Sequence, residues 1–226
     1  MTEGPATVAP PVDGLWRVAR GDNPLAVPVG GGGAPSRANR FDPLMMSYGV
    51  LYFGTDLETC FGETLARFRP SLKMLALVED EWQALGFMAV GSVAADWRQR
   101  RTVVHVRLAR DLVFVDVESP VTHQFLRREL ALGLSSIGLS DLDVSTVRGP
   151  DRRVTQMISE WAYMASSGEE PSYGGVRYES RIRSGWECWA LFEDEELEIE
   201  VLETRPITPD IPEMQTVAKL FELQVF

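Results

Sequence analysis

The chain contains few of the residues that bind metals or cross-link small folds. Its 226 residues include two cysteines, Cys60 and Cys188, and two histidines, His105 and His123. Two cysteines are too few for a disulfide-rich scaffold or for a zinc site with four thiolates. The histidines share no metal-ligand spacing, so a catalytic zinc site is not expected either. We therefore predict a site that works without a metal.

The chain also lacks a long apolar run. No stretch of about 18 apolar residues is present, and the N-terminus has no basic segment followed by an apolar one. These absences argue against a membrane segment and a secretory leader, and they predict a cytoplasmic protein. Because 45% of the residues are hydrophobic, there is enough apolar material for a core, which excludes wholesale disorder.

A surplus of basic residues is missing as well. The 22 Lys and Arg residues face 33 Asp and Glu residues, so direct binding to nucleic acid is not expected. Seven of the acids lie in residues 192–203, where Leu197, Ile199 and Val201 alternate with glutamates. This alternation predicts a strand with one face in the core and the other in water. Residues 1–40, by contrast, hold four arginines against three acids, which suits a small phosphate-bearing ligand.

Periodicity and turn residues predict a single α+β domain over residues 15–226, preceded by a flexible lead-in, residues 1–14. Residues 71–78 fit either a strand or a helix, and the tail after residue 203 fits a further strand or an irregular segment. Strands are expected at residues 15–19, 49–54, 102–108, 112–117, 185–192 and 196–203, and helices at 57–68, from Pro120 onward and at about 151–165.

A long irregular stretch, residues 21–47, separates the first two predicted strands. It contains the glycine tract Gly30–Gly33 and has neither a helical nor a strand period. A loop of this length inside a compact domain is usually functional, and its glycines let the backbone approach a ligand or move as a lid. The tract lacks the strand and helix context of a dinucleotide-redox fingerprint, so we do not assign it that role.

Five polar residues stand where building a core does not require them. They are an arginine inside the first strand, an arginine after the glycine tract, a tyrosine in an apolar strand, a mid-helix glutamate and a serine before a strand: Arg17, Arg40, Tyr52, Glu63 and Ser180. Taken one by one, each also has a structural explanation, such as a strand-edge arginine or a glutamate on the water side of a helix.

The spacing of these residues resembles that of the RES-domain family, which is named for its Arg, Glu and Ser. The matching pieces are WR at 16–17, RFD at 40–42, GVLYFGTDLETCFGE at 49–63 and GGVRYES at 174–180, the last followed by GWECWALF. The resemblance covers roughly residues 15–192, which is most of the chain.

This resemblance implies both a fold and an activity. The implied fold is a split mixed sheet with helices, similar to ADP-ribosyltransferases, around a cleft for NAD. The implied activity is cleavage of the nicotinamide–ribose bond of NAD, as a glycohydrolase, a phosphorylase or an ADP-ribosyltransferase. Many relatives are toxins, and their antitoxins carry an Xre-type helix-turn-helix domain. The implied partners are therefore NAD, as substrate, and such an antitoxin.

The resemblance also implies roles for the five residues. Glu63 would be the catalytic carboxylate, with Arg17 and Ser180 beside it. Arg17, Arg40 and Ser180 would contact NAD, and Tyr52 would shape the nicotinamide side of the cleft.

One position departs from the family pattern. Trp and Asn usually follow the second arginine, whereas this chain has Phe41 and Asp42. Phe41 preserves an aromatic surface, but Asp42 places a negative charge near a diphosphate. Whether Arg40 faces the ligand stays open at this point.

Elementary chemistry agrees with these residue types. A guanidinium is a rigid, permanently charged fork for a diphosphate. Cleavage of the nicotinamide–ribose bond passes through an oxocarbenium-like state, which a nearby carboxylate stabilises. The pyridinium leaves as neutral nicotinamide, so neither a metal nor a strong general acid is required.

Two other interpretations remain open from the sequence. The chain fits an inactive relative that binds a nucleotide or docks a partner, for which Asp42 is the best support. It also fits a protein that shares the fold and acts on another substrate. The sequence does not decide whether water, phosphate or a protein accepts the ADP-ribose, nor whether the chain forms a homo-oligomer.

Overall fold

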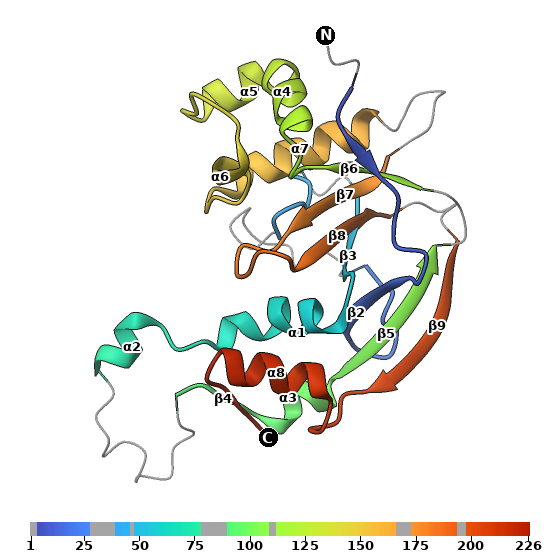
Figure 1. Cartoon of the computed structure of the whole chain (residues 1–226), viewed down its shortest axis with the longest axis vertical. Helices are drawn as coiled ribbons and strands as arrows, with labels where there is room; N and C mark the ends of the chain where they lie inside the picture. The colour runs from blue at the N-terminus through green and yellow to red at the C-terminus, as the bar shows by residue number, and fades with distance from the viewer. Residues whose placement is uncertain are drawn as a thin grey trace.

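A computed structural model describes residues 4–27, 39–45, 48–77, 90–108, 112–165, 173–193 and 198–226. Within these ranges the chain forms one mixed sheet of eight strands, a small two-stranded sheet and surrounding helices (Figure 1). The predicted α+β class and the mixed sheet are therefore confirmed.

The large sheet mixes antiparallel neighbours with one parallel pair, β6 and β7. Its strands, in spatial order, are β1 (Thr7–Val8), β6 (Val113–Asp116), β7 (Tyr173–Glu179), β8 (Glu187–Phe192), β3 (Val50–Gly54), β2 (Leu15–Arg20), β5 (Arg101–Leu108) and β9 (Ile199–Pro206). The small sheet pairs β4 (Ser92–Val93) with β10 (Gln224–Val225) in parallel.

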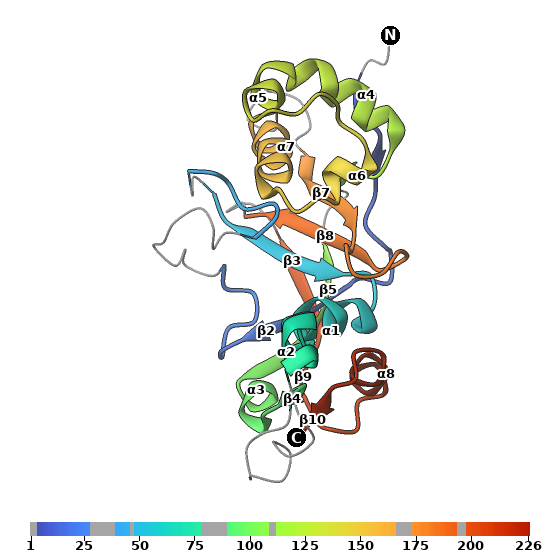
Figure 2. The ribbon, with the colours of Figure 1, turned by 90° about the vertical axis from the view of Figure 1, so that its left-hand side faces the viewer.

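The helices fall into two groups at opposite ends of the molecule (Figures 1 and 2). The first group comprises α4 (Pro120–Glu129), α5 (Ala131–Ser136), α6 (Val144–Val147) and α7 (Arg152–Ala165). The second comprises α1 (Leu57–Leu65), α2 (Leu72–Leu77), α3 (Ala95–Gln99) and α8 (Pro212–Leu220), with a 3₁₀ turn at Ala66–Phe68.

Each helical group has its own buried cluster, and a third cluster lies against strand residues. Helix α7 packs Val154 and Ile158 against β7, whereas α1 and α8 bury Phe61 and Met214 together. Successive residues of β8 belong to different clusters. Ala190 lies in the cluster of the first helical group, whereas Trp189 and Leu191 lie in the third cluster. The sheet is thus buried on both faces along β8.

Most of the predicted elements are confirmed, including the strands that carry Arg17 and Tyr52 and the helix that carries Glu63. The undecided segment at residues 71–78 contains a helix, α2. The tract Gly30–Gly33 lies outside the described residues. In the part of the chain that the structure describes, no helix is long and apolar enough to span a membrane.

Three expectations need correction. The predicted loose lead-in contains strand β1, where Thr7 pairs with Val115 of β6. The tail, expected to be a strand or irregular, contains helix α8. In β9, the edge strand of the large sheet, Val201 is 48% exposed rather than buried, and the pairing register with β5 shifts just after it, between His105 and Val106.

Candidate active site

Arg17 on β2 is fixed against the neighbouring strand β3. Its Nη1 donates to the carbonyl oxygen of Tyr52 at 2.9 Å, and its Nε donates to the carbonyl oxygen of Pro24 at 3.0 Å. Burial lowers the pKa of Arg17, although nearby Cys60 and Tyr52 oppose this shift. Within the described part of the chain Arg17 forms no ion pair with an acid, so its charge is available to an anion.

Arg40 reaches from the loop before β3 to the helices of the first group. Its Nη2 donates to the carbonyl oxygen of Val147 at 2.6 Å, and its guanidinium carbon lies 5.4 Å from the ring centre of Tyr178. Burial lowers the pKa of Arg40, and Tyr178 and Glu63 act in the opposite direction.

Glu63 and Ser180 are in direct contact, although 117 residues separate them along the chain. The Ser180 hydroxyl donates to Glu63 Oε1 at 2.5 Å and accepts from the Ile182 backbone N–H at 3.0 Å. Ser180 is buried, with 1% of its surface exposed, and its own backbone N–H donates to the carbonyl oxygen of Trp186. The glutamate is exposed, so a substrate can reach it.

Asp42 is bound by the tyrosine that the sequence assigned to the same site. The Tyr52 hydroxyl donates to Asp42 Oδ1 at 2.7 Å and accepts from the Phe41 backbone N–H at 3.1 Å. The Asn39 backbone N–H donates to the other Asp42 oxygen at 2.6 Å. Burial, together with the charge of Asp42, raises the pKa of Tyr52 well above its ordinary value. The negative charge of Asp42 is thus tied to two donors of the protein itself.

Phe41 has a different place from the one the resemblance suggested. Its side chain is fully buried, and its ring lies 4.6 Å from the ring of Tyr178. The expected aromatic surface is therefore part of the core.

Helix α1 is held in place by its first residues and by a glycine. Asp56 caps the helix, because its Oδ1 accepts the Thr59 backbone N–H at 2.6 Å. A Cβ added at Gly62 would lie 2.1 Å from a ring carbon of Trp186, so only glycine lets this indole pack on the helix. This packing fixes the turn of α1 that presents Glu63.

Arg148, which joins Glu118 to Glu179, was not identified from the sequence. Arg148, at the end of α6, donates through Nη2 to Glu118 and Glu179, each at 2.8 Å. It follows Val147, whose carbonyl oxygen holds Arg40, and Glu179 precedes Ser180. Arg148, Glu118 and Glu179 lie far apart in the sequence and share no motif, so the sequence alone does not predict that they pair.

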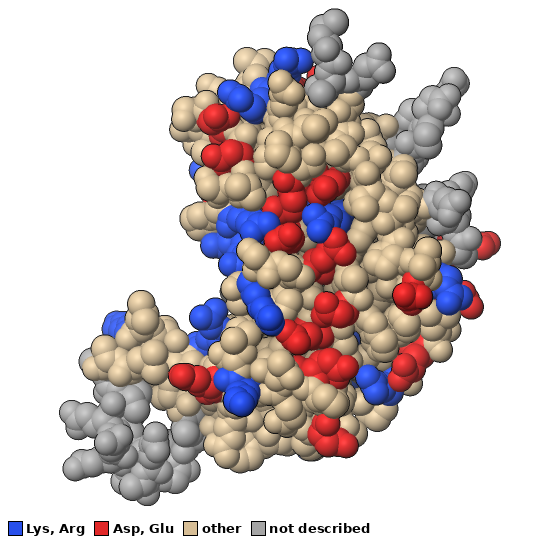
Figure 3. Space-filling view, in the orientation of Figure 1, with Lys and Arg blue, Asp and Glu red and all other residues tan. Residues whose placement is uncertain are grey.

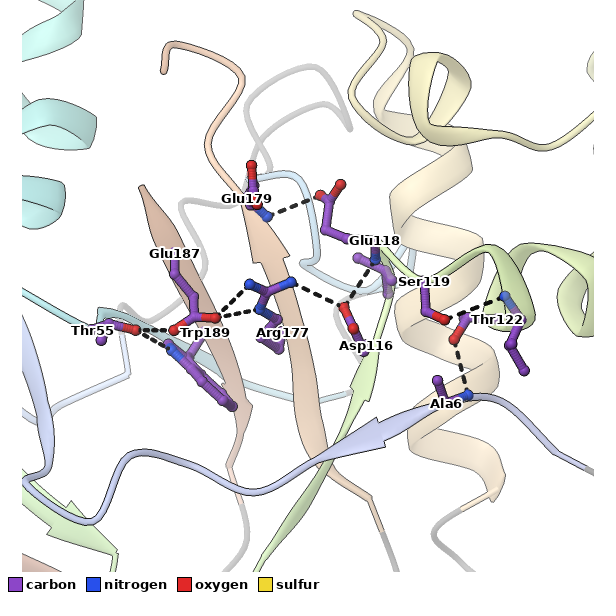
Figure 4. Close-up of polar contacts among 12 residues, drawn as sticks. Ala6, Thr55, Asp116, Glu118, Ser119, Thr122, Arg177, Glu179, Glu187 and Trp189 are labelled. Atoms are coloured by element: carbon purple, nitrogen blue, oxygen red, sulfur yellow. Dashed lines mark hydrogen bonds and ion pairs between the residues drawn. The ribbon is translucent and has the colours of Figure 1, made fainter. Parts of the chain in front are cut away.

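A second charged network joins strands β6, β7 and β8. Arg177 lies between Asp116 and Glu187 (Figure 4). Its Nη1 is 3.2 Å from Asp116 Oδ1, and its Nη2 is 2.5 Å from Glu187 Oε1. Glu187 also accepts the Thr55 hydroxyl at 2.5 Å, and the Trp189 indole N–H donates to Thr55 at 2.9 Å. Strand β7, which ends at Glu179 just before Ser180, is thereby joined to both of its neighbouring strands.

The histidines and cysteines have structural contacts. His123 is buried, and its Nε2 lies 2.8 Å from the carbonyl oxygen of Val117. The ring of His105 stacks on that of Trp16, with 4.0 Å between the ring centres. Both cysteines are buried, and burial raises the pKa of Cys60 to about 12, so it is a neutral thiol at physiological pH. Among the described residues, no three His, Cys, Asp or Glu side chains are grouped to hold a metal ion.

The five predicted residues are therefore linked to one another. Arg17 binds the backbone of Tyr52, and the Tyr52 hydroxyl binds the residues that follow Arg40. The charge of Glu63 opposes the lowering of the Arg40 pKa, and Glu63 binds Ser180. Two cations without an ion pair in the described residues and one exposed carboxylate thus belong to one connected group.

The model of the RES domain matches residues 14–210 of this chain. The chain belongs to the RES-domain family. Among solved structures, one chain of the crystal structure of the M. tuberculosis MbcT–MbcA toxin–antitoxin complex has a similar fold, with a TM-score of 0.55 and 13% sequence identity. That similarity covers 96% of this RES-domain chain and 92% of the other chain. No curated protein matches the sequence.

Proposed function

We propose that this RES-domain protein consumes NAD by cleaving the bond between nicotinamide and ribose, on an ADP-ribosyltransferase-like fold. The observation that carries the proposal is the hydrogen bond from the buried Ser180 hydroxyl to Glu63, an exposed carboxylate that lies 117 residues away in the sequence. Membership of the RES-domain family supports the same activity.

In this proposal the two arginines bind the diphosphate of NAD. Each already uses part of its guanidinium to hold a backbone carbonyl, Arg17 that of Tyr52 and Arg40 that of Val147. A guanidinium fixed in this way loses little further freedom when it binds a phosphate. The Tyr52 hydroxyl and the Asn39 N–H bind the Asp42 carboxylate and hold it within the protein, although these neutral donors leave its negative charge in place.

Glu63 would stabilise the ribose as the bond to nicotinamide breaks. The electron pair of that bond goes to the pyridinium nitrogen, which leaves as neutral nicotinamide, and positive charge develops on the ribose. A carboxylate favours this charge most when no cation of the protein already neutralises it. The Ser180 hydroxyl orients Glu63 through one hydrogen bond and adds no charge.

We also propose that the protein is the toxin of a toxin–antitoxin pair. The structural neighbour from the M. tuberculosis MbcT–MbcA toxin–antitoxin complex supports this role, as does the family. An antitoxin with an Xre-type helix-turn-helix domain is the partner that the family resemblance implies. Expression of the wild-type chain in a bacterial host should arrest growth, whereas the Glu63→Gln chain should not.

The direct test of the activity is release of nicotinamide. Purified protein is incubated with NAD in buffer alone, with inorganic phosphate, and with a bacterial lysate as a source of protein acceptors. Nicotinamide and the ADP-ribose product are separated by chromatography, and the arm with the fastest release identifies the acceptor. NAD that binds in calorimetry yet is recovered intact from every arm would contradict the enzyme and support a nucleotide-binding module.

A further inference from the structure

One cavity of the molecule is lined by none of the five residues of the proposed active site. Its volume is about 500 Å³, and its lining comes mainly from the start of α1, the turn between β7 and β8, and the start of α8. The lining residues are Trp16, Asp56, Leu57, Glu58, Arg183, Ser184, Gly185, Trp186, Arg205 and Glu213. This volume is within the range of cavities that hold one small ligand or one large side chain.

The walls of this cavity already accept guanidinium groups. Arg183 lies over the indole of Trp186 at 5.4 Å, and its Nη1 is 2.5 Å from Glu58 Oε1. Arg205 lies 5.9 Å from the ring centre of Trp16. Indole faces and carboxylates are the groups that attract an arginine side chain most strongly, through cation–π contacts and paired hydrogen bonds.

The charges of the lining do not balance. Arg183 is paired with Glu58, and Arg205 is paired with Glu203 outside the cavity at 3.3 Å. Two further carboxylates of the lining, Asp56 and Glu213, form no ion pair within the described ranges. One oxygen of Glu213, Oε2, is buried without a hydrogen-bond donor, which is unfavourable for a carboxylate.

We propose that this cavity binds an arginine side chain of a partner protein. The guanidinium of the partner would lie between the indoles of Trp16 and Trp186, and it would pair with the carboxylates of Asp56 and Glu213. Figure 3 shows Asp and Glu side chains in a band down the middle of one face of the molecule, with Lys and Arg side chains beside and between them. The proposal adds a docking site and does not depend on the reaction at Glu63.

An anion is a poorer occupant than a cation. Each arginine of the lining has a glutamate within 3.3 Å, although the buried Nε of Arg205 has no hydrogen-bond acceptor, whereas two of the three acids of the lining have no ion pair among the described residues. An anion at the start of α1 would also meet the carboxylates of Asp56 and Glu58. Repulsion from these acids outweighs the attraction of the helix N-terminus.

The test uses Nα-acetyl-L-arginine amide as the probe and the full chain labelled with ¹⁵N. The indole N–H of Trp186 donates to Glu58 at 3.1 Å, so its resonance reports on the cavity directly. We expect the Trp16 and Trp186 indole signals to shift with saturation at millimolar probe. Nα-acetyl-L-citrulline amide has nearly the same shape without the charge and should bind at least about tenfold more weakly.

Two variants locate the binding. Glu213→Gln and Asp56→Asn each remove one negative charge, and asparagine preserves the cap of α1. Each should weaken binding of the arginine probe by about threefold to fivefold. Glu129→Gln, at the exposed end of α4, is the matched control and should bind the probe as the wild type does.

Three results would overturn the proposal. The first is equal binding of the arginine and citrulline probes. The second is unchanged binding by both cavity variants. The third is a saturable shift of the same indole signals by inorganic phosphate, with none by the arginine probe, since this would make the cavity an anion site.

Discussion

Helix α1 carries two glutamates whose surroundings differ. Glu58 contacts a cation and an indole, since Arg183 Nη1 lies 2.5 Å from its Oε1 and the Trp186 N–H donates to the same oxygen at 3.1 Å. Glu63, five residues later, accepts from the neutral hydroxyl of Ser180. On this short helix Glu58 therefore has an arginine partner, whereas no ion pair within 4.0 Å is found for Glu63 among the described residues.

The difference indicates what each side of the helix can do. A carboxylate paired with an arginine has little electrostatic attraction left for a new positive charge. A carboxylate oriented by a hydroxyl keeps its full charge and its position, which suits a site where positive charge develops during a reaction. This difference agrees with our proposals of NAD cleavage on the Glu63 side of α1 and of partner docking on the Glu58 side.

The largest expected effect comes from exchanging each glutamate for glutamine. Glu63→Gln keeps the acceptor for the Ser180 hydroxyl and removes the charge, so the rate of nicotinamide release should fall by about 100-fold to 1,000-fold. Glu58→Gln should change that rate by less than about threefold, because its charge is already neutralised. Equal losses of the release rate in the two variants would show that the two glutamates do not differ in their role in the reaction.

The next effect is on stability and concerns Arg148. Arg148→Met leaves Glu118 and Glu179 without their shared cation, and the side chain of Glu118 is 9% exposed. The free energy of unfolding, measured with urea, should fall by about 2–3 kcal/mol. The control is Arg153→Met, which breaks an exposed pair with Asp151 and should cost less than about 1 kcal/mol. Equal costs would show that Arg148 does not brace the site.

A substitution between the two glutamates tests the packing of α1. Gly62→Ala places a methyl group 2.1 Å from a ring carbon of Trp186, which should destabilise the fold by about 1–3 kcal/mol. Gly133→Ala in α5 meets only the flexible side chain of Met157 at 2.9 Å and should be neutral or slightly stabilising. A Gly62→Ala protein as stable as the wild type would mean that Trp186 does not pack on this helix.

The smallest effect depends on pH and concerns the cap of α6, the helix whose Val147 holds Arg40. Hydrogen bonds from Ser145 and Thr146 lower the pKa of Asp143 from 3.8 to about 2. A lowered pKa in the folded state stabilises the fold above pH 3.8, and this contribution is lost as the pH falls toward 2. Asp143→Ala should therefore lower the Tm by about 1–2 °C at pH 6.

The same pair of proteins gives the pH test. The Tm difference between wild type and Asp143→Ala should narrow between about pH 5 and pH 2. Asp143→Asn keeps a cap that does not titrate, so its Tm should change less with pH than that of the wild type. A constant difference for Asp143→Ala across this range would contradict the assignment.

Local patterns in the sequence predict the elements that carry the site. The strands around Arg17 and Tyr52 follow from their apolar residues, and Asp56 marks the start of the helix that carries Glu63. Helix α8 was missed although it has a signal, since a proline stands at its first position and Met214, Val217 and Ala218 follow a helical spacing.

Other features depend on contacts that no local pattern contains. Val201 is exposed in β9, and the place of β9 at the edge of the sheet depends on how distant strands pair. Phe41 is buried because the loop before β3 packs against β7. Arg148 joins two glutamates from other elements. The cavity at the start of α1 exists because the β7–β8 turn and α8 meet there.

The most direct test of the account is a crystal structure of the Glu63→Gln protein with NAD bound. The account predicts the diphosphate at the guanidinium groups of Arg17 and Arg40, and the nicotinamide ribose between Ser180 and residue 63. NAD bound instead in the cavity lined by Trp16 and Trp186, with the two arginines free of phosphate, would contradict it.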